Sequence, residues 1–340
     1  MSPPMALNPA CGFNTRALRA SGPPLQAIKW IFAQFAKKLS ISDDEARTFV
    51  YPRSKRFQWA DTNMNDGFTH IEAKDLSYCN SFPSPKRHFV IRWVENLTGR
   101  IKILKLAKQH QNEPPLPGNF WQQAMTRMGI NTDIGDEALA KIPKTGPLII
   151  VANHPHGLVD GMVLCEIMSR VRDDFQIMTR AFLAKVPDIN DRMLPVAFDH
   201  EDDAIKKNVQ ARKDALNHVK NGGCLILFPA GRVAHSDTLF GDAVDGDWTN
   251  FLSRLVIRGK ANVVPMFFHG QNSRAYLMAA KLSPTFRQGL LMHEVVRSLN
   301  TDMRPIVGDV IPFEELESLG LPPKDLAAHL RAHTLALGAK

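Results

Sequence analysis

Residues 146–161 constrain the fold more than any other stretch of the chain. Residues 147–152 form a short apolar run rich in branched side chains, which predicts a buried strand. The run ends at Asn153, where polar and turn-forming residues begin. Residues 161–172 then carry apolar side chains at helical spacing. This succession of strand, polar turn and helix is typical of the units that build open α/β sheets.

The same alternation continues along the chain. Further strands are predicted at 175–179, 224–228 and 263–268, a short segment near 193–198, and helices at 119–129, 160–171 and 202–220. In the last of these helices we expect the inward face to carry Ile205, Val209, Leu216 and Val219. Because strands alternate with helices, we predict an α/β fold with a mainly parallel sheet covered by helices on both faces.

The segment before this region is rich in basic residues. Residues 86–108 repeat apolar side chains at helical spacing and carry seven Lys or Arg but one acid, Glu95. A basic amphipathic helix indicates a membrane surface more than a DNA groove, and a helix packed on the core is the alternative. The apolar stripe would consist of Val90, Val94, Leu97, Ile101 and Leu104.

We therefore divide the 340 residues into three parts. Residues 1–85 form a partly helical extension, in which residues 25–39 predict a helix with one apolar stripe. Residues 86–118 hold the N-terminal helical basic amphipathic segment and a proline-rich linker, and residues 119–340 form the main domain.

The composition limits the partners and the compartment. The net charge of +8 favours an anionic partner. No window has the roughly 18 apolar residues that a membrane-spanning helix needs, and the N-terminus lacks the regions of a signal peptide. The four scattered cysteines indicate neither a zinc site nor a disulfide framework. We therefore expect a cytoplasmic protein with reduced thiols.

The turn after the first predicted strand carries acid–base chemistry. It contains His154 and His156, and Asp160 follows them. A carboxylate that bonds one imidazole nitrogen sets the tautomer, so that the other nitrogen accepts a proton from a hydroxyl or water. No nucleophile motif accompanies the pair. The two histidines also resemble a metal chelate, but the pattern of dinuclear metallohydrolases does not continue, and we expect no metal.

Three later turns contain further polar groups. Phe228, Pro229, Gly231 and Arg232 follow a strand and form a candidate phosphate cradle. After the strand at 263–268, the candidates His269, Asn272 and Ser273 lie in a polar turn, and Arg180 and Lys185 follow the strand at 175–179.

Together these blocks resemble a known enzyme family. Asn153-His154 with Asp160, the run from Phe228 to Arg232, and the run from Val264 to Phe268 are similar to the glycerophospholipid acyltransferases of the PlsC type. The resemblance covers about residues 88–312 and is closest to the bacterial hemolysin-like and lyso-ornithine-lipid branch, in which a run like residues 95–100 precedes the domain.

The resemblance implies a reaction and its participants. His154 would remove the proton of a lysolipid hydroxyl, Asp160 would hold His154, and the hydroxyl oxygen would attack the thioester of acyl-ACP or acyl-CoA. Asn153, the block of Phe228, Pro229, Gly231 and Arg232, and the polar groups Arg180, Lys185 and Asn272 would bind substrate. No cofactor is implied. The enzyme would act as a peripheral protein at an anionic membrane surface, on the inner membrane of a bacterium, without nucleic acid.

Two positions differ from the common family pattern. His154 and Asp160 enclose five residues where the common motif has four, so His156 is an alternative base. We prefer His154 because it follows the strand directly. Ala230 replaces the usual Glu, which allows an acceptor without phosphate. Two other functions stay open: an ester hydrolase in which the same pair activates water, and a non-catalytic peripheral membrane protein.

Overall fold

The structure is a computed structural model that describes residues 76–180, 187–197, 200–238 and 241–339. The chain divides into two units, Met1–Met64 and Asn65–Lys340, and all described residues belong to the second. The helix expected at 25–39 lies outside the described residues. So does Lys185.

One sheet of six strands organises the second unit. Its spatial order is β3-β2-β4-β1-β5-β6, and all neighbouring strands are parallel except β5 and β6. The strands are β1 Leu148–Ala152, β2 Phe175–Arg180, β3 Met193–Val196, β4 Cys224–Leu227, β5 Asn262–Phe267 and β6 Ile306–Val307. The predicted α/β class and mainly parallel sheet are therefore confirmed.

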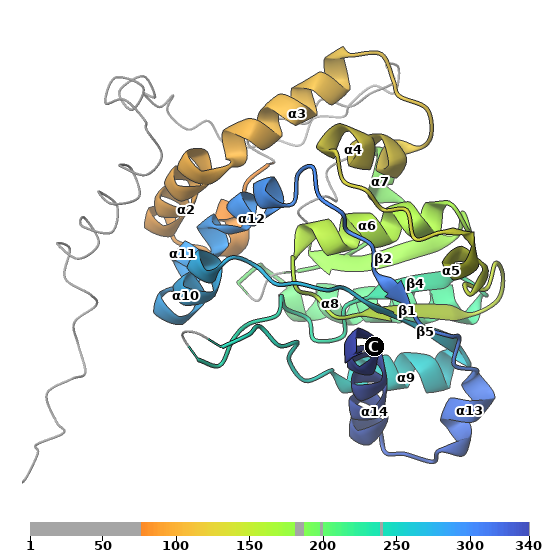
Figure 1. Ribbon diagram of the computed structural model, residues 1–340. Coiled ribbons are helices and arrows are strands. Elements are labelled where there is room, and N and C mark those ends of the chain that lie inside the picture. Colours follow the sequence, from red (N-terminus) through yellow and green to blue (C-terminus); the bar gives the residue numbers. More distant parts are fainter. Residues whose placement is uncertain (1–75, 181–186, 198–199, 239–240, 340) are drawn as a thin grey trace, which may run out of the picture. The chain divides into compact units, whose positions relative to one another are not determined.

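Helices cover both faces of this sheet (Figure 1). The flanking helices are η1 Tyr78–Ser81, α2 Pro85–Thr98, α3 Arg100–Asn112, α4 Phe120–Met128, α5 Asp136–Ala140, α6 Leu158–Ser169, α7 Pro187–Asn190, α8 Ala204–Lys220, α9 Asn250–Gly259, α10 Arg274–Leu282, α11 Pro284–Gly289, α12 Leu291–Arg297, α13 Phe313–Ser318, α14 Pro323–Ala336 and η2 Leu337–Ala339. Alternate side chains of β1 enter different cores: Ile150 packs with α4 and α6, and Ile149 with α8, α9 and α14. A strand buried on both faces reads as a continuous apolar run, which is why β1 was recognisable in the sequence.

The single helix predicted over 86–108 is wrong in one respect. It is divided at Gly99 into α2 and α3. A Cβ at Gly99 would lie 2.7 Å from the carbonyl oxygen of Met292, so the close approach of α12 excludes a side chain there. The expected stripe is also displaced: Val94 is buried, but Leu97 and Ile101 are exposed.

The predicted inward face of α8 is wrong for its first half. Ile205 and Val209 are 83% and 60% exposed, whereas Ala211, Ala215 and Val219 are buried. This helix packs on β3, β4 and α9. The small alanines allow α8 to lie close to these elements. The spacing of the large apolar residues does not show that the alanine face is the buried one.

A further layer of helices lies beyond one edge of the sheet. Helix α11 contacts α2, α10, α12 and η1. Its closest approach to α2 is at Gly289, where a Cβ would lie 2.9 Å from the Cβ of Val94. The buried Glu95 joins α2 to η1 by accepting hydrogen bonds from the Ser77 hydroxyl and the Tyr78 backbone, both at 2.6 Å. This helical layer supplies the second wall of the site described next.

Candidate active site

The site begins where β1 ends. The Asn153 side chain donates to the Phe268 carbonyl at 2.9 Å and accepts from the Phe268 N–H at 2.7 Å. Because β1 and β5 are parallel neighbours, their carboxyl ends meet at the same sheet edge. Asn153 ties these two ends together and thereby sets the start of the turn that carries His154.

His154 and Asp160 are paired. The Nδ1 atom of His154 lies 3.0 Å from Oδ2 of Asp160, which is fully buried at the start of α6. The imidazole stacks on the Phe228 ring, with centroids 4.0 Å apart and an angle of 25° between the planes. These contacts occupy Nδ1 and one ring face. Nε2 has no hydrogen-bond partner among the described residues.

Asp160 also holds the turn itself. Its Oδ2 accepts from the backbone N–H groups of His156 and Gly157, at 2.8 and 3.0 Å, and its Oδ1 lies 3.0 Å from Nδ1 of His156. Burial by itself raises the pKa of Asp160, but the hydrogen bonds from both histidines outweigh it and hold that pKa below its usual value. The carboxylate is therefore charged at neutral pH. Gly157 permits this reach because its φ of +80° suits glycine.

The two histidines on Asp160 occupy different places. His154 lines a cavity, whereas His156 does not. The Nε2 atom of His156 lies against Gly270, where a Cβ would be only 3.0 Å away. Burial lowers the pKa of His156, but the hydrogen bond and charge of Asp160 outweigh this and raise it. His156 is thus a second ring on the same carboxylate, directed away from the cavity.

A second carboxylate positions the His154 backbone. Oδ1 of Asp245 accepts the His154 N–H at 3.1 Å, and Oδ2 accepts the Trp248 indole N–H at 2.7 Å. Burial raises the pKa of Asp245 despite these bonds. The His154 carbonyl accepts from the Ala234 N–H at 2.8 Å. The turn after β1 is therefore bonded on both sides to the segment that follows β4.

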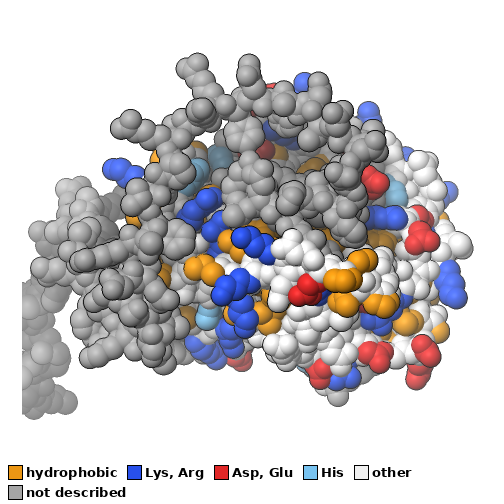
Figure 2. All heavy atoms as spheres, turned by 90° about the horizontal axis from the view of Figure 1, so that it is seen from above, with side chains coloured by type: hydrophobic (Ala, Val, Ile, Leu, Met, Phe, Trp, Pro, Cys, Tyr) orange, Lys and Arg blue, Asp and Glu red, His pale blue; other side chains and the backbone are white. Residues whose placement is uncertain are grey.

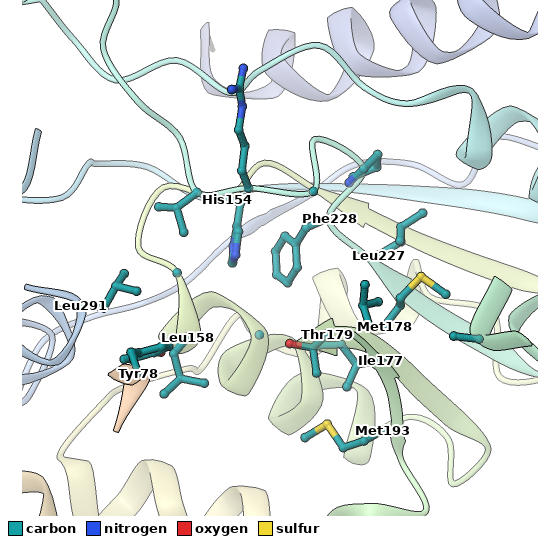
Figure 3. A pocket seen from close by; sticks show the side chains of 18 of the residues that line it. Tyr78, His154, Leu158, Ile177, Met178, Thr179, Met193, Leu227, Phe228 and Leu291 are labelled. Carbon is teal, nitrogen blue, oxygen red and sulfur yellow. The ribbon is translucent and has the colours of Figure 1, made fainter. Parts of the chain in front are cut away.

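His154 faces a cavity of about 680 Å³ between the sheet edge and the helical layer. Figure 3 shows Phe228 beside His154, with Ile177, Met178 and Met193 further along the cavity and Tyr78, Leu158 and Leu291 on another side. Deeper apolar residues from α6 and β2 include Met162, Cys165 and Ile177. The cavity thus combines one imidazole with a largely apolar interior.

The candidate residues from the sequence divide into groups. His154, Phe228, Pro229, Gly231 and Arg232 line the cavity. The lining does not include Asn153, His156, Asp160, His269, Asn272 or Ser273. Asn272 is buried, and its amide nitrogen has no hydrogen-bond partner. Arg180 ends β2, and its side chain, like all of Lys185, lies outside the described part.

Several residues of the site were missed by sequence reasoning. Asp245 lies in a segment without helical or strand periodicity. It bonds to His154 only in the folded chain, because the two residues are 91 positions apart in the sequence. Tyr276, Arg287 and Leu291 come from α10, α11 and α12, which no motif connected to the cavity. Burial raises the pKa of Tyr276 to about 12, so its phenol stays protonated.

The cysteines, possible metal-ligand clusters and helix lengths are next considered within the described residues. Among the described residues, Cys79, Cys165 and Cys224 are buried and form no disulfide, and Cys11 lies outside the described residues. Within the described ranges, no group of three or more His, Cys, Asp or Glu side chains is arranged to hold a metal ion. In the same part of the chain, no helix has both the length and the apolar character to cross a membrane.

Comparison with protein families decides the class of this protein. Residues 77–299 match the family model described as "Acyltransferase". The chain belongs to this acyltransferase family. The resemblance found in the motifs, and the prediction that the protein is an acyltransferase enzyme, are confirmed. The matched range of the acyltransferase includes η1, α2 and the cavity-lining elements up to α12.

Two individual proteins are similar to this acyltransferase. The lyso-glycine lipid O-acyltransferase of Phocaeicola vulgatus is 21% identical over 242 residues, which cover 69% of this chain and 82% of that protein. The crystal structure of the 1-acyl-sn-glycerophosphate (LPA) acyltransferase PlsC from Thermotoga maritima aligns with a TM-score of 0.40 and 17% identity. That alignment covers 74% of this chain and 88% of the other.

Proposed function

We propose that this acyltransferase transfers a fatty acyl group from a thioester donor to the hydroxyl of a lysolipid, with His154 as the general base. The observation that carries the proposal is the position of His154. Its Nδ1 is held by the buried Asp160, and its Nε2 has no hydrogen-bond partner among the described residues, in a largely apolar cavity. A positioned imidazole of this kind accepts a proton at neutral pH.

The reaction follows from this geometry. Nε2 of His154 takes the proton of the acceptor hydroxyl while the hydroxyl oxygen attacks the thioester carbonyl carbon. The tetrahedral intermediate collapses, the C–S bond breaks, and the thiolate leaves with the proton that His154 returns. Asp160 stays ionised and stabilises the imidazolium in between, because its pKa is held low. The donor is acyl-ACP or acyl-CoA, and no cofactor takes part.

His154 rather than His156 is the base in this proposal. Both rings bond Asp160 through Nδ1, but His154 alone lines the cavity of the two. His156 turns its second nitrogen toward Gly270. The apolar interior around Ile177 and Met193 suits an acyl chain, and Arg232 suits the polar head of the acceptor.

The enzyme acts, in this proposal, as a peripheral protein on an anionic membrane, the cytoplasmic face of the inner membrane. Phe89, Trp93 and Leu97 lie one helical turn apart on α2 and are 55%, 41% and 38% exposed. Lys86 and Arg87 are exposed in the first turn of this helix. In the view from above, basic side chains lie beside hydrophobic ones on the described surface (Figure 2). Aromatic and basic side chains together favour an anionic interface.

The decisive experiment measures acyl transfer from labelled acyl-ACP and acyl-CoA to a panel of lysolipids. We expect His154→Ala and Asp160→Asn to lower the rate by about 100- to 10,000-fold. His329→Ala, at an exposed position on α14, is the matched control and retains the wild-type rate. Release of free fatty acid without acylated product would instead identify a hydrolase. Lipid profiling of a strain without the protein names the acceptor that accumulates.

A further inference from the structure

Helices α8 and α9 lie side by side on one face of the sheet. A Cβ at Gly259 of α9 would lie 2.7 Å from Cγ1 of Val219 of α8, and the guanidinium carbon of Arg212 lies 5.5 Å from the centre of the Phe251 ring. These two contacts are about two helical turns apart in each helix and follow the same order. The helices therefore run parallel to each other, and both pack on the core that contains Ile149.

The exposed surface of this helix pair is basic. Residues 204–220 and 250–260 contain one acid, Asp214, which accepts a hydrogen bond from the Gln210 side chain at 2.7 Å. Other acids stand just before the helices: Glu201, Asp202 and Asp203 before α8, where Glu201 pairs with Lys207, and Asp247 before α9. Beyond these ends, the exposed cations are Arg212, Lys213, Lys220, Arg254, Arg258 and Lys260, which we call the α8–α9 face.

The cations of the α8–α9 face are not neutralised within the described protein. No described carboxylate lies within ion-pair distance of any of the six. Large apolar side chains are exposed on the same helices: Val209, one turn before Arg212, is 60% exposed, and Ile257 is 40% exposed. Unpaired cations beside apolar groups match a partner that is acidic and also buries apolar surface.

The apolar groups favour a protein over a membrane as this partner. The large hydrophobic side chains that are exposed on α8 and α9 are Ile205, Val209 and Ile257, and none is aromatic. Aromatic rings are the side chains enriched at the headgroup level of a bilayer. Helix α2 exposes Phe89 and Trp93, whereas the α8–α9 face exposes aliphatic groups only.

The α8–α9 face also adjoins the cavity that His154 faces. Ala211 and Arg212 of α8, together with Thr249 and Phe251 at the start of α9, line this cavity. Arg212 belongs to both the face and the cavity wall. A flexible arm from a partner docked on the face would therefore enter the cavity beside Arg212.

We propose that the α8–α9 face docks an acidic carrier protein, whose pantetheine arm presents the acyl thioester to His154 through the cavity. This inference rests on the proposed function and specifies its donor as protein-bound. The cations from Arg212 to Lys220 extend along about 12 Å of α8 and continue onto a second helix. Such a spread matches an extended acidic surface better than the compact nucleotide end of CoA. Complementary charge of this kind mainly speeds the encounter of the two proteins.

The test compares two thioester donors that deliver the same acyl group. Steady-state KM and kcat are measured with acyl-ACP and with acyl-CoA, and the lysolipid is presented in micelles of a neutral detergent. The variants are Lys213→Glu, Arg254→Glu and their combination, and the control is Lys144→Glu, an exposed lysine before the amino end of β1. We expect the double variant to raise KM for acyl-ACP by about 10- to 100-fold, because the reversed charges repel an acidic partner.

The other measurements fix what the face binds. KM for acyl-CoA should stay at the wild-type value in the double variant, as should both KM values in Lys144→Glu. In wild type, KM for acyl-ACP should rise with salt more steeply than in the double variant, because salt screens the attraction. If the double variant melts at a lower temperature, Lys213→Gln with Arg254→Gln decides through the same comparison of donors.

Several outcomes would overturn docking on this face. They are an unchanged KM for acyl-ACP in the double variant, and an equal rise of KM for acyl-CoA. Loss of binding to anionic vesicles with an unchanged KM for acyl-ACP would assign the face to the membrane instead. Wild type that uses acyl-CoA but not acyl-ACP would refute this inference alone. Failure of wild type to acylate any lysolipid with either donor would refute the proposed function.

Discussion

At the scale of single residues, Asp160 is the group on which the site depends. It accepts hydrogen bonds from two imidazoles and two backbone N–H groups. Sequence reasoning had already paired Asp160 with a histidine and had left His154 and His156 as alternatives. The structure places both rings on the one carboxylate, so the two histidines are partners rather than exclusive choices.

His156 should therefore act through Asp160 and not on the substrate. His156→Asn retains a donor near the place of Nδ1 but cannot be protonated, whereas His156→Ala removes the donor. We expect His156→Ala to destabilise the fold by about 1–3 kcal/mol, because a buried charged acceptor loses a partner. His156→Asn should cost less, and its kcat should stay near the wild-type value. A loss of kcat in the Asn variant equal to that of His154→Ala would contradict this role.

The pH dependence of stability separates the charge from the hydrogen bond in the same variants. The folded-state pKa of His156 is raised, so the protonated ring adds stability that is fully present below the unfolded value of about 6.5. That contribution disappears as the pH rises through the folded pKa. The free energy of unfolding of wild type minus that of His156→Asn should therefore be largest below about pH 6.5 and shrink as the pH rises above it. Urea unfolding of both proteins at a series of pH values measures this difference.

At the scale of elements, strands were more predictable than helix faces. β1 and β5 are buried on both faces, so their apolar runs identified them directly. The faces of α2 and α8 were misassigned because large apolar residues at helical spacing are not always the buried ones. In α8, Ala211 and Ala215 are buried, whereas Ile205 and Val209 in the first half of the helix are exposed.

Helix α8 offers a paired test of this assignment. Ala215 is fully buried in the core between the sheet and α9, so Ala215→Leu should cost about 1–3 kcal/mol through overpacking. Ile205 is 83% exposed, so Ile205→Gln should change stability by less than about 0.5 kcal/mol. Urea denaturation of both variants checks the assignment. A larger loss of stability for Ile205→Gln than for Ala215→Leu would show instead that the face expected from the periodicity is the buried one.

At the scale of the whole molecule, the positive charge has two uses. Part of the net charge of +8 lies on exposed basic residues beside the apolar side chains of α2. Another part lines the cavity as arginines without described carboxylate partners. The total charge alone predicted an anionic partner. Only the fold separates the basic residues on the exposed surface from those that line the cavity.

The membrane proposal has a matched test on the whole molecule. Phe89→Ser with Leu97→Ser should weaken binding to anionic vesicles by about tenfold, because burial of apolar surface at the interface is lost. Leu319→Ser with Leu321→Ser alters similarly exposed leucines near α13 and should leave binding unchanged. Lys→Gln changes at the exposed Lys102, Lys105 and Lys108 should weaken binding mainly at low salt, whereas Arg100 is buried and is left unchanged. Cosedimentation with anionic vesicles measures the binding of all three sets of variants. An equal loss of binding in the Leu319/Leu321 control would contradict a membrane-binding surface on α2.

The sequence by itself determined the α/β class, the strands β1, β2, β4 and β5, and the pairing of a histidine with Asp160, because these depend on local patterning and on residues close in the chain. The three-part division of the chain remains a prediction. The tertiary structure decided which helix faces are buried, which histidine lines the cavity, and that Asp245 and Arg287 reach the site. Those choices depend on contacts between residues far apart in the chain. Patterns along a single sequence do not record which distant surfaces meet when the core closes.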